Sequence, residues 1–296
     1  MSIFGIPYQG SKYRLLKQIF PYFLKSKNFY DLFGGGFSVT HFILKKYPSY
    51  YENYYFNEPR EGIIDLIQDS IKGKYSYENF KPKFIDRETF FKEKEKSAYI
   101  RMSWSFGNNG CTYLFGKKIE IYKKALHNAA VFNEYDEIYL KEFNNEKMPK
   151  DLKDIKERRL WIRRKVKELK GHPFKRLEQL EQLERLQRLE KLNFNLNFSK
   201  SCYSKIKIKK NSFIYCDIPY DNGDKRNYDR LKFNYSQFFN WAANQKNPVL
   251  ISEYEIKDKR LKEIASFEHK SIINHIGPTK STEKLFANEA YLKLII

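Results

Sequence analysis

Three consecutive glycines follow a short hydrophobic run near the start of the chain, and this arrangement limits the folds that the chain can adopt. The run Phe29 to Phe33 predicts a strand, and the residues from Phe37 to Lys46 predict a helix. A second aromatic strand, Tyr54 to Phe56, ends at Asn57-Glu58. A strand, a glycine turn, a helix and a second strand are typical of the start of a parallel α/β sheet.

Strand patterns return only near the other end of the chain, which indicates one domain interrupted by an insertion. The later strands are predicted at 193–198, 212–216, 248–252, 271–276 and 290–296. Phe238, Phe239 and Trp241 lie on an intervening helix and are expected in the core. The segment between is charged and mostly helical. We therefore predict a discontinuous domain, 1–71 and 190–296, with an inserted region at 72–189.

Two helical segments of the insertion have distinctive patterns. Residues 151–170 predict a helix with an apolar face and a neighbouring basic face, the latter formed by Lys156, Arg159, Arg163, Lys167 and Lys170. A solvated surface helix explains the same pattern. Leucine recurs at every third position from Leu177 to Leu192, which shifts each leucine by about 60° around an α-helix and predicts no continuous apolar seam.

The chain is strongly basic, which favours a polyanionic partner. Of its 296 residues, 56 are Lys or Arg and 36 are Asp or Glu, so the formal net charge is +20. Nucleic acid is the first candidate. A general compositional bias toward lysine explains the same charge without any binding role.

Composition also bounds the class of protein. Hydrophobic residues make up 41% and aromatic residues 17%, which is enough apolar surface for a packed core. The three cysteines are far apart in sequence and form no CxxC or Cys/His pattern, so we expect neither disulfides nor a metal site. Nowhere do 18 apolar residues occur together, and we expect a cytoplasmic protein without a membrane span.

The glycine turn and the acid that follows it predict a nucleoside pocket. Glycines let the backbone approach a ligand closely, and Glu58, at the end of the next strand, can accept hydrogen bonds from ribose hydroxyls. The dinucleotide fingerprint is not met, because Val39 stands where its last small residue belongs, and no phosphate-binding GxxxxGK[ST] motif occurs.

A second motif follows an apolar strand. Residues 212–216 lead into Asp217-Ile218-Pro219-Tyr220, at the strand end where open α/β sheets bind ligands. The Asp217 carboxylate and the Ile218 carbonyl can hold an aromatic amine. Pro219 would fix the carbonyl direction and Tyr220 would stack on a base. In a duplex, such a base must first be flipped out.

These motifs together resemble the Dam-type family of adenine-N6 DNA methyltransferases, in the branch common among phage-encoded enzymes. The matching runs appear in the family's order and cover roughly 1–70 and 190–296. They are Pro7-Tyr8-Gln9-Gly10-Ser11-Lys12, Asp31-Leu32-Phe33-Gly34-Gly35-Gly36, Asn57-Glu58, Asn197-Phe198, Asp217-Ile218-Pro219-Tyr220 and Thr282-Glu283-Lys284-Leu285-Phe286. The run Ser105 to Lys117 also resembles phage members.

The resemblance implies the class I S-adenosylmethionine-dependent methyltransferase fold, a Rossmann-like mixed sheet with helices on both faces and a mainly helical inserted recognition domain. It implies that 1–71 and 190–296 bind S-adenosyl-L-methionine and carry out transfer, and that 72–189 recognises double-stranded DNA. The implied cofactor site comprises Tyr8, Lys12, Asp31, Phe33, Gly34, Gly35, Gly36, Glu58, Asn197, Phe198 and Asp217. Two positions depart from the family: Ile218 replaces a proline, and Asn197 replaces a common acid.

The mechanism that follows is direct in-line methyl transfer to the amine, without a metal and without a dedicated base. Phosphate contacts would position the duplex and base contacts would select the sequence. The candidate DNA-binding residues are Arg101, Asn108, Asn109, Arg159 and Arg163. The sequence leaves two alternatives open: an RNA or protein-amide methyltransferase of the same fold, and a catalytically silent DNA-binding homologue.

Overall fold

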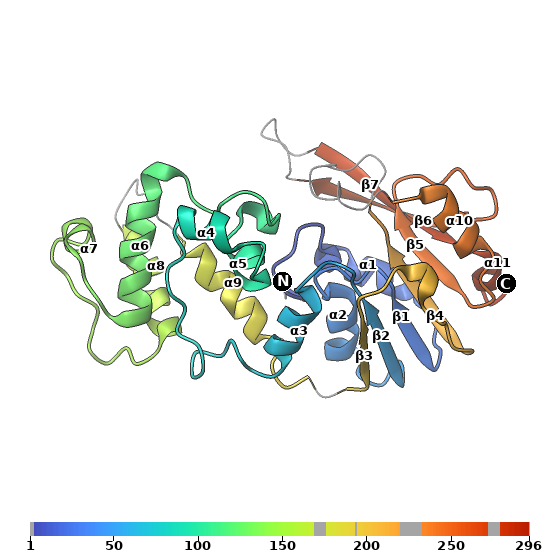
Figure 1. Ribbon diagram of the computed structural model, residues 1–296, viewed down its shortest axis with the longest axis horizontal. Helices are drawn as coiled ribbons and strands as arrows, with labels where there is room; N and C mark the ends of the chain where they lie inside the picture. Colours follow the sequence, from blue (N-terminus) through green and yellow to red (C-terminus); the bar gives the residue numbers. More distant parts are fainter. Residues whose placement is uncertain (1–2, 169–175, 193, 220–232, 272–278, 296) are drawn as a thin grey trace. The chain divides into compact units, whose positions relative to one another are not determined.

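The computed structural model describes residues 3–168, 176–192, 194–219, 233–271 and 279–295 (Figure 1). Its contacts divide the chain into two compact units. Unit 1 comprises Met1–Gly5, Gly10–Ile64 and Leu192–Ile296. Unit 2 comprises Ile6–Gln9 and Asp65–Lys191.

Unit 1 alternates strands and helices along its described residues. Its N-terminal part contains η1 (Lys12–Arg14), α1 (Leu16–Ile19), η2 (Phe20–Tyr22), β1 (Asn28–Asp31), α2 (Ser38–Lys46) and β2 (Asn53–Asn57), and helix α3 (Ile63–Ile71) begins at its boundary. Its C-terminal part contains β3 (Leu196–Ser199), η4 (Tyr203–Lys205), β4 (Ser212–Asp217), α10 (Tyr235–Ala243), β5 (Val249–Glu253), β6 (Lys262–Ser271), β7 (Thr279–Ala287) and α11 (Glu289–Leu292).

The seven strands of unit 1 form one sheet in the order β3-β2-β1-β4-β5-β7-β6. Strands β1 to β5 pair in parallel, whereas β7 is antiparallel to both β5 and β6. Strand β7 is therefore the one described strand that runs against the others. This order and direction are those of the class I S-adenosylmethionine-dependent methyltransferase fold, so the predicted fold is confirmed.

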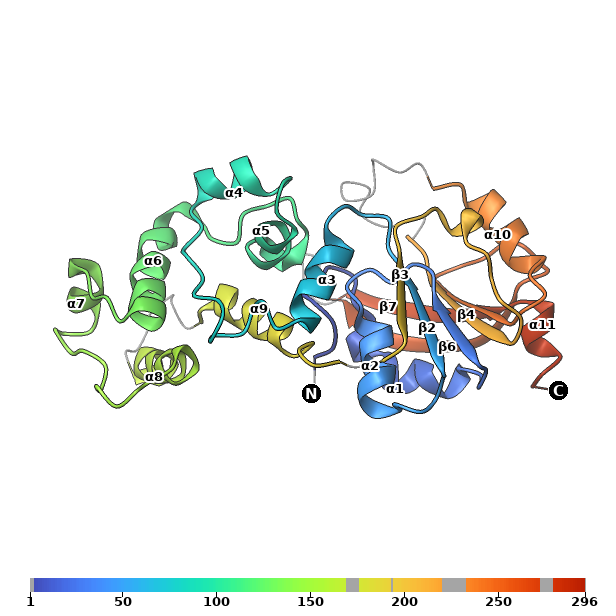
Figure 2. The same cartoon turned by 60° about the horizontal axis from the view of Figure 1, so that its bottom comes forward.

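Helices cover both faces of the sheet because its central strands are apolar on both sides (Figure 2). On one face, Tyr30, Ile214 and Ile251 pack with Phe238 of α10. The prediction that this aromatic helix belongs to the core is confirmed. On the other face, Phe23, which follows η2, contacts the rings of Phe29, Phe213 and Tyr215 at centroid distances of 5.0 to 5.8 Å.

The C-terminal predictions were partly wrong. The strands expected at 212–216 and 248–252 are β4 and β5, and the one expected at 193–198 is the shorter β3. The predicted strand at 290–296 is instead α11, because Asn288 accepts a hydrogen bond from the Tyr291 backbone and caps a helix there. The strand expected at 271–276 lies almost wholly outside the described residues. Neither β7 nor β6, which shares only Ser271 with that expected strand, was predicted.

Unit 2 is helical in its described residues, as expected. It contains α4 (Arg87–Glu93), α5 (Ala98–Ser103), η3 (Phe106–Asn108), α6 (Lys117–Phe132), α7 (Glu137–Glu142), α8 (Ile155–Glu168) and α9 (Glu178–Gln187). Its main core forms between α6, α7, α8 and α9. Among the described residues of the chain, no helix is both long and apolar enough to cross a membrane.

The leucines spaced three apart do form one buried face, contrary to the sequence expectation. Leu180, Leu183 and Leu186 are each fully buried. Helix α9 is only 10 residues long, so these three leucines drift by about 120° in total and stay on one side. Leu177 and Leu189 are also buried, but they lie outside the regular helix. The segment is therefore a core helix of unit 2.

Candidate active site

Three acidic residues lie at or just after the carboxyl ends of strands in unit 1. Asp31 ends β1, Glu58 follows β2, and Asp217 ends β4. Since these strands are parallel, their carboxyl ends meet at one edge of the sheet. The sequence therefore places the acids correctly at one edge, and the tertiary structure supplies their partners.

Asp31 is buried beneath the glycine turn and is only half satisfied. Its Oδ2 accepts a hydrogen bond of 2.7 Å from Thr40 Oγ1. Its Oδ1 is buried and has no hydrogen-bond partner within the described part of the chain. Burial raises the pKa of Asp31 to about 7, although the Thr40 hydrogen bond opposes this shift. The free oxygen is a ready acceptor for a ligand that carries a positive charge.

The glycine turn is held by residues at the end of β2. Gly35 N donates to Glu58 Oε2 at 2.9 Å, and Gly34 N donates to the Asn57 carbonyl at 3.0 Å. A Cβ atom on Gly34 would lie 2.0 Å from Cε2 of Phe56. Glycine is therefore required at position 34 by the close approach of the turn to β2.

Glu58 is not free to serve a ligand alone. Its Oε1 accepts from the backbone N and the Nε of Arg60, at 3.0 and 3.1 Å. Burial raises the pKa of Glu58 to about 7, while the hydrogen bonds from Arg60 and Gly35 lower it. Ribose hydroxyls bound here would have to share this carboxylate with the Arg60 side chain.

Asp217 forms a buried ion pair with Lys12 of η1. The Lys12 ammonium lies 2.8 Å from Asp217 Oδ1 and 3.4 Å from Glu283 Oε1 of β7. Burial raises the pKa of Asp217 to about 6; Lys12 opposes this shift and Glu283 adds to it. Sequence reasoning named Lys12 and Asp217 separately. It assigned no role to Glu283, whose only signal was its membership of a family motif.

Sequence reasoning also missed Glu253, the last residue of β5. It is 2% exposed, and its Oε1 accepts from Tyr254 N at 2.7 Å. Its Oε2 has no hydrogen-bond partner among the described residues. Burial raises the pKa of Glu253 to about 8, and Glu283 and Asp217 add to the shift. The one sequence feature that indicated Glu253 as a site residue was its position at the end of an apolar strand.

The rest of the tetrapeptide is anchored differently from the expectation for a proline pair. Ile218 is buried in the core between β4, β5 and α10, and the Pro219 carbonyl accepts a hydrogen bond of 2.8 Å from Tyr235. These two contacts hold the backbone at the strand end. Tyr220 lies outside the described residues.

The remaining expected cofactor residues occupy different surroundings. Phe33 packs on Tyr203 and on Phe238, at 5.6 and 5.4 Å between ring centroids. Phe198 of β3 packs on Phe56, at 5.8 Å, and so supports the glycine turn. Asn197 is exposed, with its amide nitrogen 3.3 Å from the Tyr54 carbonyl. Tyr8 is buried within unit 2, and Gly36 is buried in the turn of unit 1.

The side chains of Asn108 and Asn109 form hydrogen bonds within the loop that contains them. Asn108 is buried at φ 56°, and its side chain donates to the Met102 carbonyl at 2.9 Å. Asn109 Oδ1 accepts from the backbone of Cys111 and Thr112. We therefore correct the expectation that Asn108 faces DNA, because the turn buries and uses its side chain. Asn109 is partly exposed, and its expected contact with DNA stays a prediction. Phe106, which we had not singled out, is 59% exposed on this loop.

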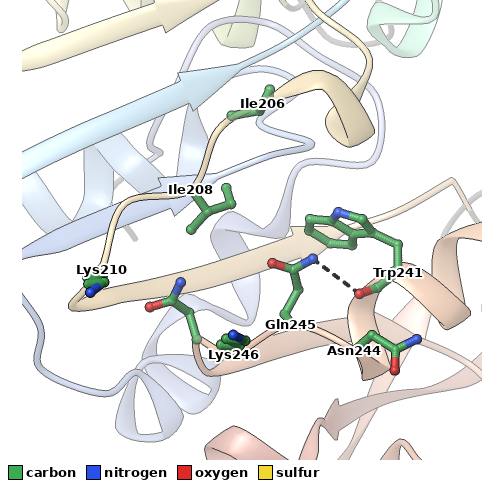
Figure 3. Close-up of a pocket in the computed structure, with 8 residues that line it drawn as sticks. Ile206, Ile208, Lys210, Trp241, Asn244, Gln245 and Lys246 are labelled. Carbon is green, nitrogen blue, oxygen red and sulfur yellow. Dashed lines mark hydrogen bonds between the residues drawn. The ribbon is translucent and has the colours of Figure 1, made fainter.

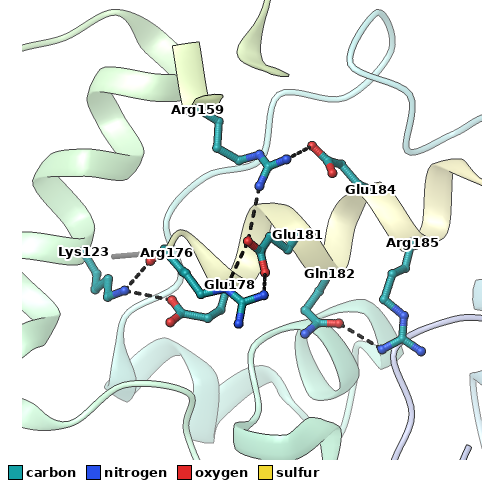
Figure 4. Close-up of polar contacts among 8 residues, drawn as sticks. All are labelled: Lys123, Arg159, Arg176, Glu178, Glu181, Gln182, Glu184 and Arg185. Carbon is teal, nitrogen blue, oxygen red and sulfur yellow. Dashed lines mark hydrogen bonds and ion pairs between the residues drawn. The ribbon is translucent and has the colours of Figure 1, made fainter. Parts of the chain in front are cut away.

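Arg159 does not lie on a basic surface of α8. It follows Ile155 by four residues and precedes Ile162 by three, so it shares their buried face. Its guanidinium pairs with Glu181 and Glu184 of α9, at 3.5 and 2.6 Å (Figure 4). The expectation that Arg159 binds DNA is wrong for this reason.

Two of the expected DNA-binding residues keep some exposure. Arg163 is exposed on α8, and Arg101 of α5 is partly buried, with one guanidinium nitrogen 3.4 Å from the Lys94 carbonyl. Lys123 of α6 is buried and pairs with Glu178 at 2.8 Å, so not every cation of unit 2 is available to a partner (Figure 4).

A pocket of about 310 Å³ lies elsewhere in unit 1 (Figure 3). Ile206, Ile208 and Trp241 line it together with polar residues. Lys210 and Asn247 of its lining precede β4 and β5, so the pocket is at the amino ends of these strands. It is therefore separate from the acids at the carboxyl ends.

Neither metal ligands nor disulfides occur in the described part of the chain. No group of three or more His, Cys, Asp or Glu side chains there has the arrangement to hold a metal ion. Cys111, Cys202 and Cys216 form no disulfide with one another.

Comparison with known proteins finds a distant structural similarity and no matching family. No model of a known protein family and no curated protein matches this chain. Among solved structures, the chain is similar to the rRNA methyltransferase aviRa from Streptomyces viridochromogenes. The similarity covers 97% of this chain and 89% of that chain, with 10% identity and a TM-score of 0.38. A similarity this low supports no statement about substrate, and the class I methyltransferase fold stands on the strand order.

Proposed function

We propose that this protein is an S-adenosylmethionine-dependent methyltransferase that modifies the N6 amine of adenine in double-stranded DNA. The observation that carries the proposal is Asp217. Its carboxyl group lies at the end of β4 in a class I methyltransferase sheet, in the Asp-Ile-Pro-Tyr motif, and it is paired with a buried lysine. The same sheet edge carries the glycine turn and the acid after β2.

The residues at this edge fit S-adenosylmethionine. The cofactor supplies an electrophilic methyl group on a positively charged sulfur, beside an ammonium group and a ribose. Asp31 offers an unused buried oxygen to an ammonium group. The Glu58 carboxylate can accept hydrogen bonds from ribose hydroxyls if Arg60 gives up some of its hydrogen bonds to that carboxylate. Burial raises the pKa values of Asp31, Glu58 and Asp217. A bound cation would lower these pKa values, because a nearby positive charge stabilises the ionised carboxylates.

Asp217 and the Ile218 carbonyl would hold the target amine in line with the methyl group. A carboxylate that accepts an amine hydrogen raises the electron density on nitrogen, and orientation supplies most of the rate. The amine gains its acidity only after it is methylated, so the departing proton needs no dedicated base. Adenine must leave the duplex to reach this group, at a cost of a few kcal/mol.

Unit 2 would provide the contacts to DNA. Arg163 and Arg101 remain candidates, and Phe106 adds an exposed aromatic ring on the loop that contains Asn108. A net charge of +20 supports a polyanionic partner. If phosphate contacts dominate, DNA affinity falls steeply as salt increases.

The decisive experiment measures transfer of a labelled methyl group from S-adenosylmethionine into duplex DNA. N6-methyladenine is then mapped by sequencing, and Asp217→Ala is compared with the wild type. We expect transfer by the wild type and a loss of at least about 100-fold in the variant. Transfer to RNA or to protein amides, but not to DNA, would establish one of the alternative substrates. Cofactor binding without transfer to any of the three would establish a silent homologue.

A further inference from the structure

Lys12 joins two carboxylates that come from distant parts of unit 1. Its ammonium lies 2.8 Å from Asp217 Oδ1 and 3.4 Å from Glu283 Oε1. Strand β7 is antiparallel to β5, with Leu285 beside Ser252, so residues near its start reach the edge where β4 ends. Reversal of one strand thus brings Glu283 to the same edge as Asp217.

All three side chains are largely removed from solvent. Lys12 is 5% exposed, Glu283 is 2% exposed and Asp217 is 19% exposed. Burial lowers the pKa of Lys12, but Asp217 and Glu283 raise it more, and the net result is a pKa above its usual value. The ammonium is therefore charged throughout the physiological range.

The charge of Lys12 matters because Asp217 has acidic neighbours on several elements. A carboxylate surrounded by acids in a buried site would otherwise be protonated at neutral pH. The charged or titratable groups that act on Asp217 or respond to it are Lys12 from η1, Asp31 from β1, Tyr215 and Cys216 from β4, Glu253 from β5, Tyr254 after β5, and Glu283 from β7.

We infer that Lys12 and Glu283 are positioning residues for Asp217, an inference that rests on the proposed function. Lys12 binds Oδ1, keeps the carboxylate ionised and leaves Oδ2 to accept the target amine. Glu283 holds the ammonium from its other side, so the lysine keeps one position as the base enters. Neither residue has to touch the reacting atoms for this role.

The inference predicts that two substitutions shift the pH–rate profile in opposite directions. Lys12→Met removes the cation beside Asp217. The acid limb of the pH–rate profile is therefore expected to move to higher pH, by about 1 to 3 pH units. Glu283→Gln keeps the shape of the side chain but removes a repelling charge, so the same limb is expected to move to lower pH. The double variant should lie between the two single variants.

A matched control exists on the same strands. Glu263 of β6 pairs with Lys284 of β7 at 2.9 Å, and both side chains are substantially exposed. Glu263→Gln removes one charge from an ion pair that includes neither Lys12 nor Asp217, and it should leave the profile unchanged. Thermal unfolding and the dissociation constant of S-adenosylmethionine are measured for every variant. The Glu283→Gln constant should stay within about threefold of the wild type, since an isosteric change at a surrounding residue leaves the cofactor contacts intact.

A direct titration makes the test independent of turnover. In protein labelled with ¹³C at the aspartate carboxyl carbon, the Asp217 resonance is identified by its loss in Asp217→Asn. Its midpoint should rise in Lys12→Met and fall in Glu283→Gln. Unchanged midpoints, or shifts in the same direction, would overturn the inference even if wild-type DNA methylation is confirmed. If the midpoints shift as expected but no methyl transfer occurs, the electrostatic pairing stands and the proposed function fails.

Discussion

Thr40 donates a hydrogen bond of 2.7 Å to one oxygen of Asp31 and leaves the other oxygen buried without a partner among the described residues. Helix α2 thus holds the acid at the end of β1 in a fixed orientation while one acceptor site stays open. Burial keeps the pKa of Asp31 near 7, so its ionisation is sensitive to a bound cation.

Cofactor binding should therefore depend on pH. A cation binds the ionised form of Asp31 and lowers its pKa, so protons are released on binding. The affinity for S-adenosylmethionine should increase as pH rises from about 6 to 8. Asp31→Asn should weaken binding about 10- to 100-fold and flatten this dependence, because it removes a charged acceptor. Isothermal titration calorimetry in buffers of different ionisation enthalpy measures both the affinity and the proton release.

Thr40→Val is the matched control for this pH dependence. It keeps the shape of the side chain but removes the donor to Asp31, so the transition in affinity should move to higher pH. A Thr40→Val protein whose affinity follows the wild-type pH curve would argue against Asp31 as the titrating group.

Glu253 should make the protein less stable in alkali. Its folded pKa of about 8 lies above the ordinary glutamate value of 4.5, so its contribution to stability is complete below about pH 4.5 and is lost as pH rises through 8. Glu253→Gln should raise the free energy of unfolding by about 2 kcal/mol at pH 9 and change it much less at pH 5. Urea unfolding at both pH values measures the difference, and an equal effect at both would contradict the titration of Glu253.

Gly34→Ala should disrupt the turn of unit 1. The added Cβ would lie 2.0 Å from the Phe56 ring, and relieving that overlap is expected to cost about 1–3 kcal/mol of stability and to weaken cofactor binding. Gly116→Ala is the control, because nothing lies within 4 Å of its added Cβ and its φ of −69° suits alanine. Thermal unfolding of the two variants, with and without S-adenosylmethionine, compares them.

Substitutions of Arg159 and Arg163 should have different effects, the first on stability and the second on DNA binding. Arg159→Met removes the buried cation that pairs with Glu181 and Glu184, while Arg176 still pairs with Glu181 at 2.9 Å. This change should destabilise the protein by about 1–3 kcal/mol. Arg163→Ala changes an exposed residue and should alter stability by less than about 0.5 kcal/mol. It should weaken DNA binding and reduce its salt dependence. A stable Arg163→Ala protein with wild-type DNA affinity at every salt concentration would remove Arg163 from the interface.

Sequence by itself determined the parts that depend on local chemistry. Apolar runs followed by Gly34-Gly35-Gly36 or by Asp217 predict strands that end in a turn, because strand and turn preferences are properties of neighbouring residues. Parallel pairing then follows from the alternation with helices, and it brings Asp31, Glu58 and Asp217 to one edge.

Only the tertiary structure decided what these acids face. The reversed direction of β7 brings Glu283 to Lys12, about 270 residues away in sequence, and no local pattern records such a pairing. The sequence pattern predicts that Arg159 lies on a basic helix face. Packing of α8 against α9 instead buries it between two glutamates. Burial and ion pairing depend on contacts between distant segments, so they became visible only when the strands and helices were assembled.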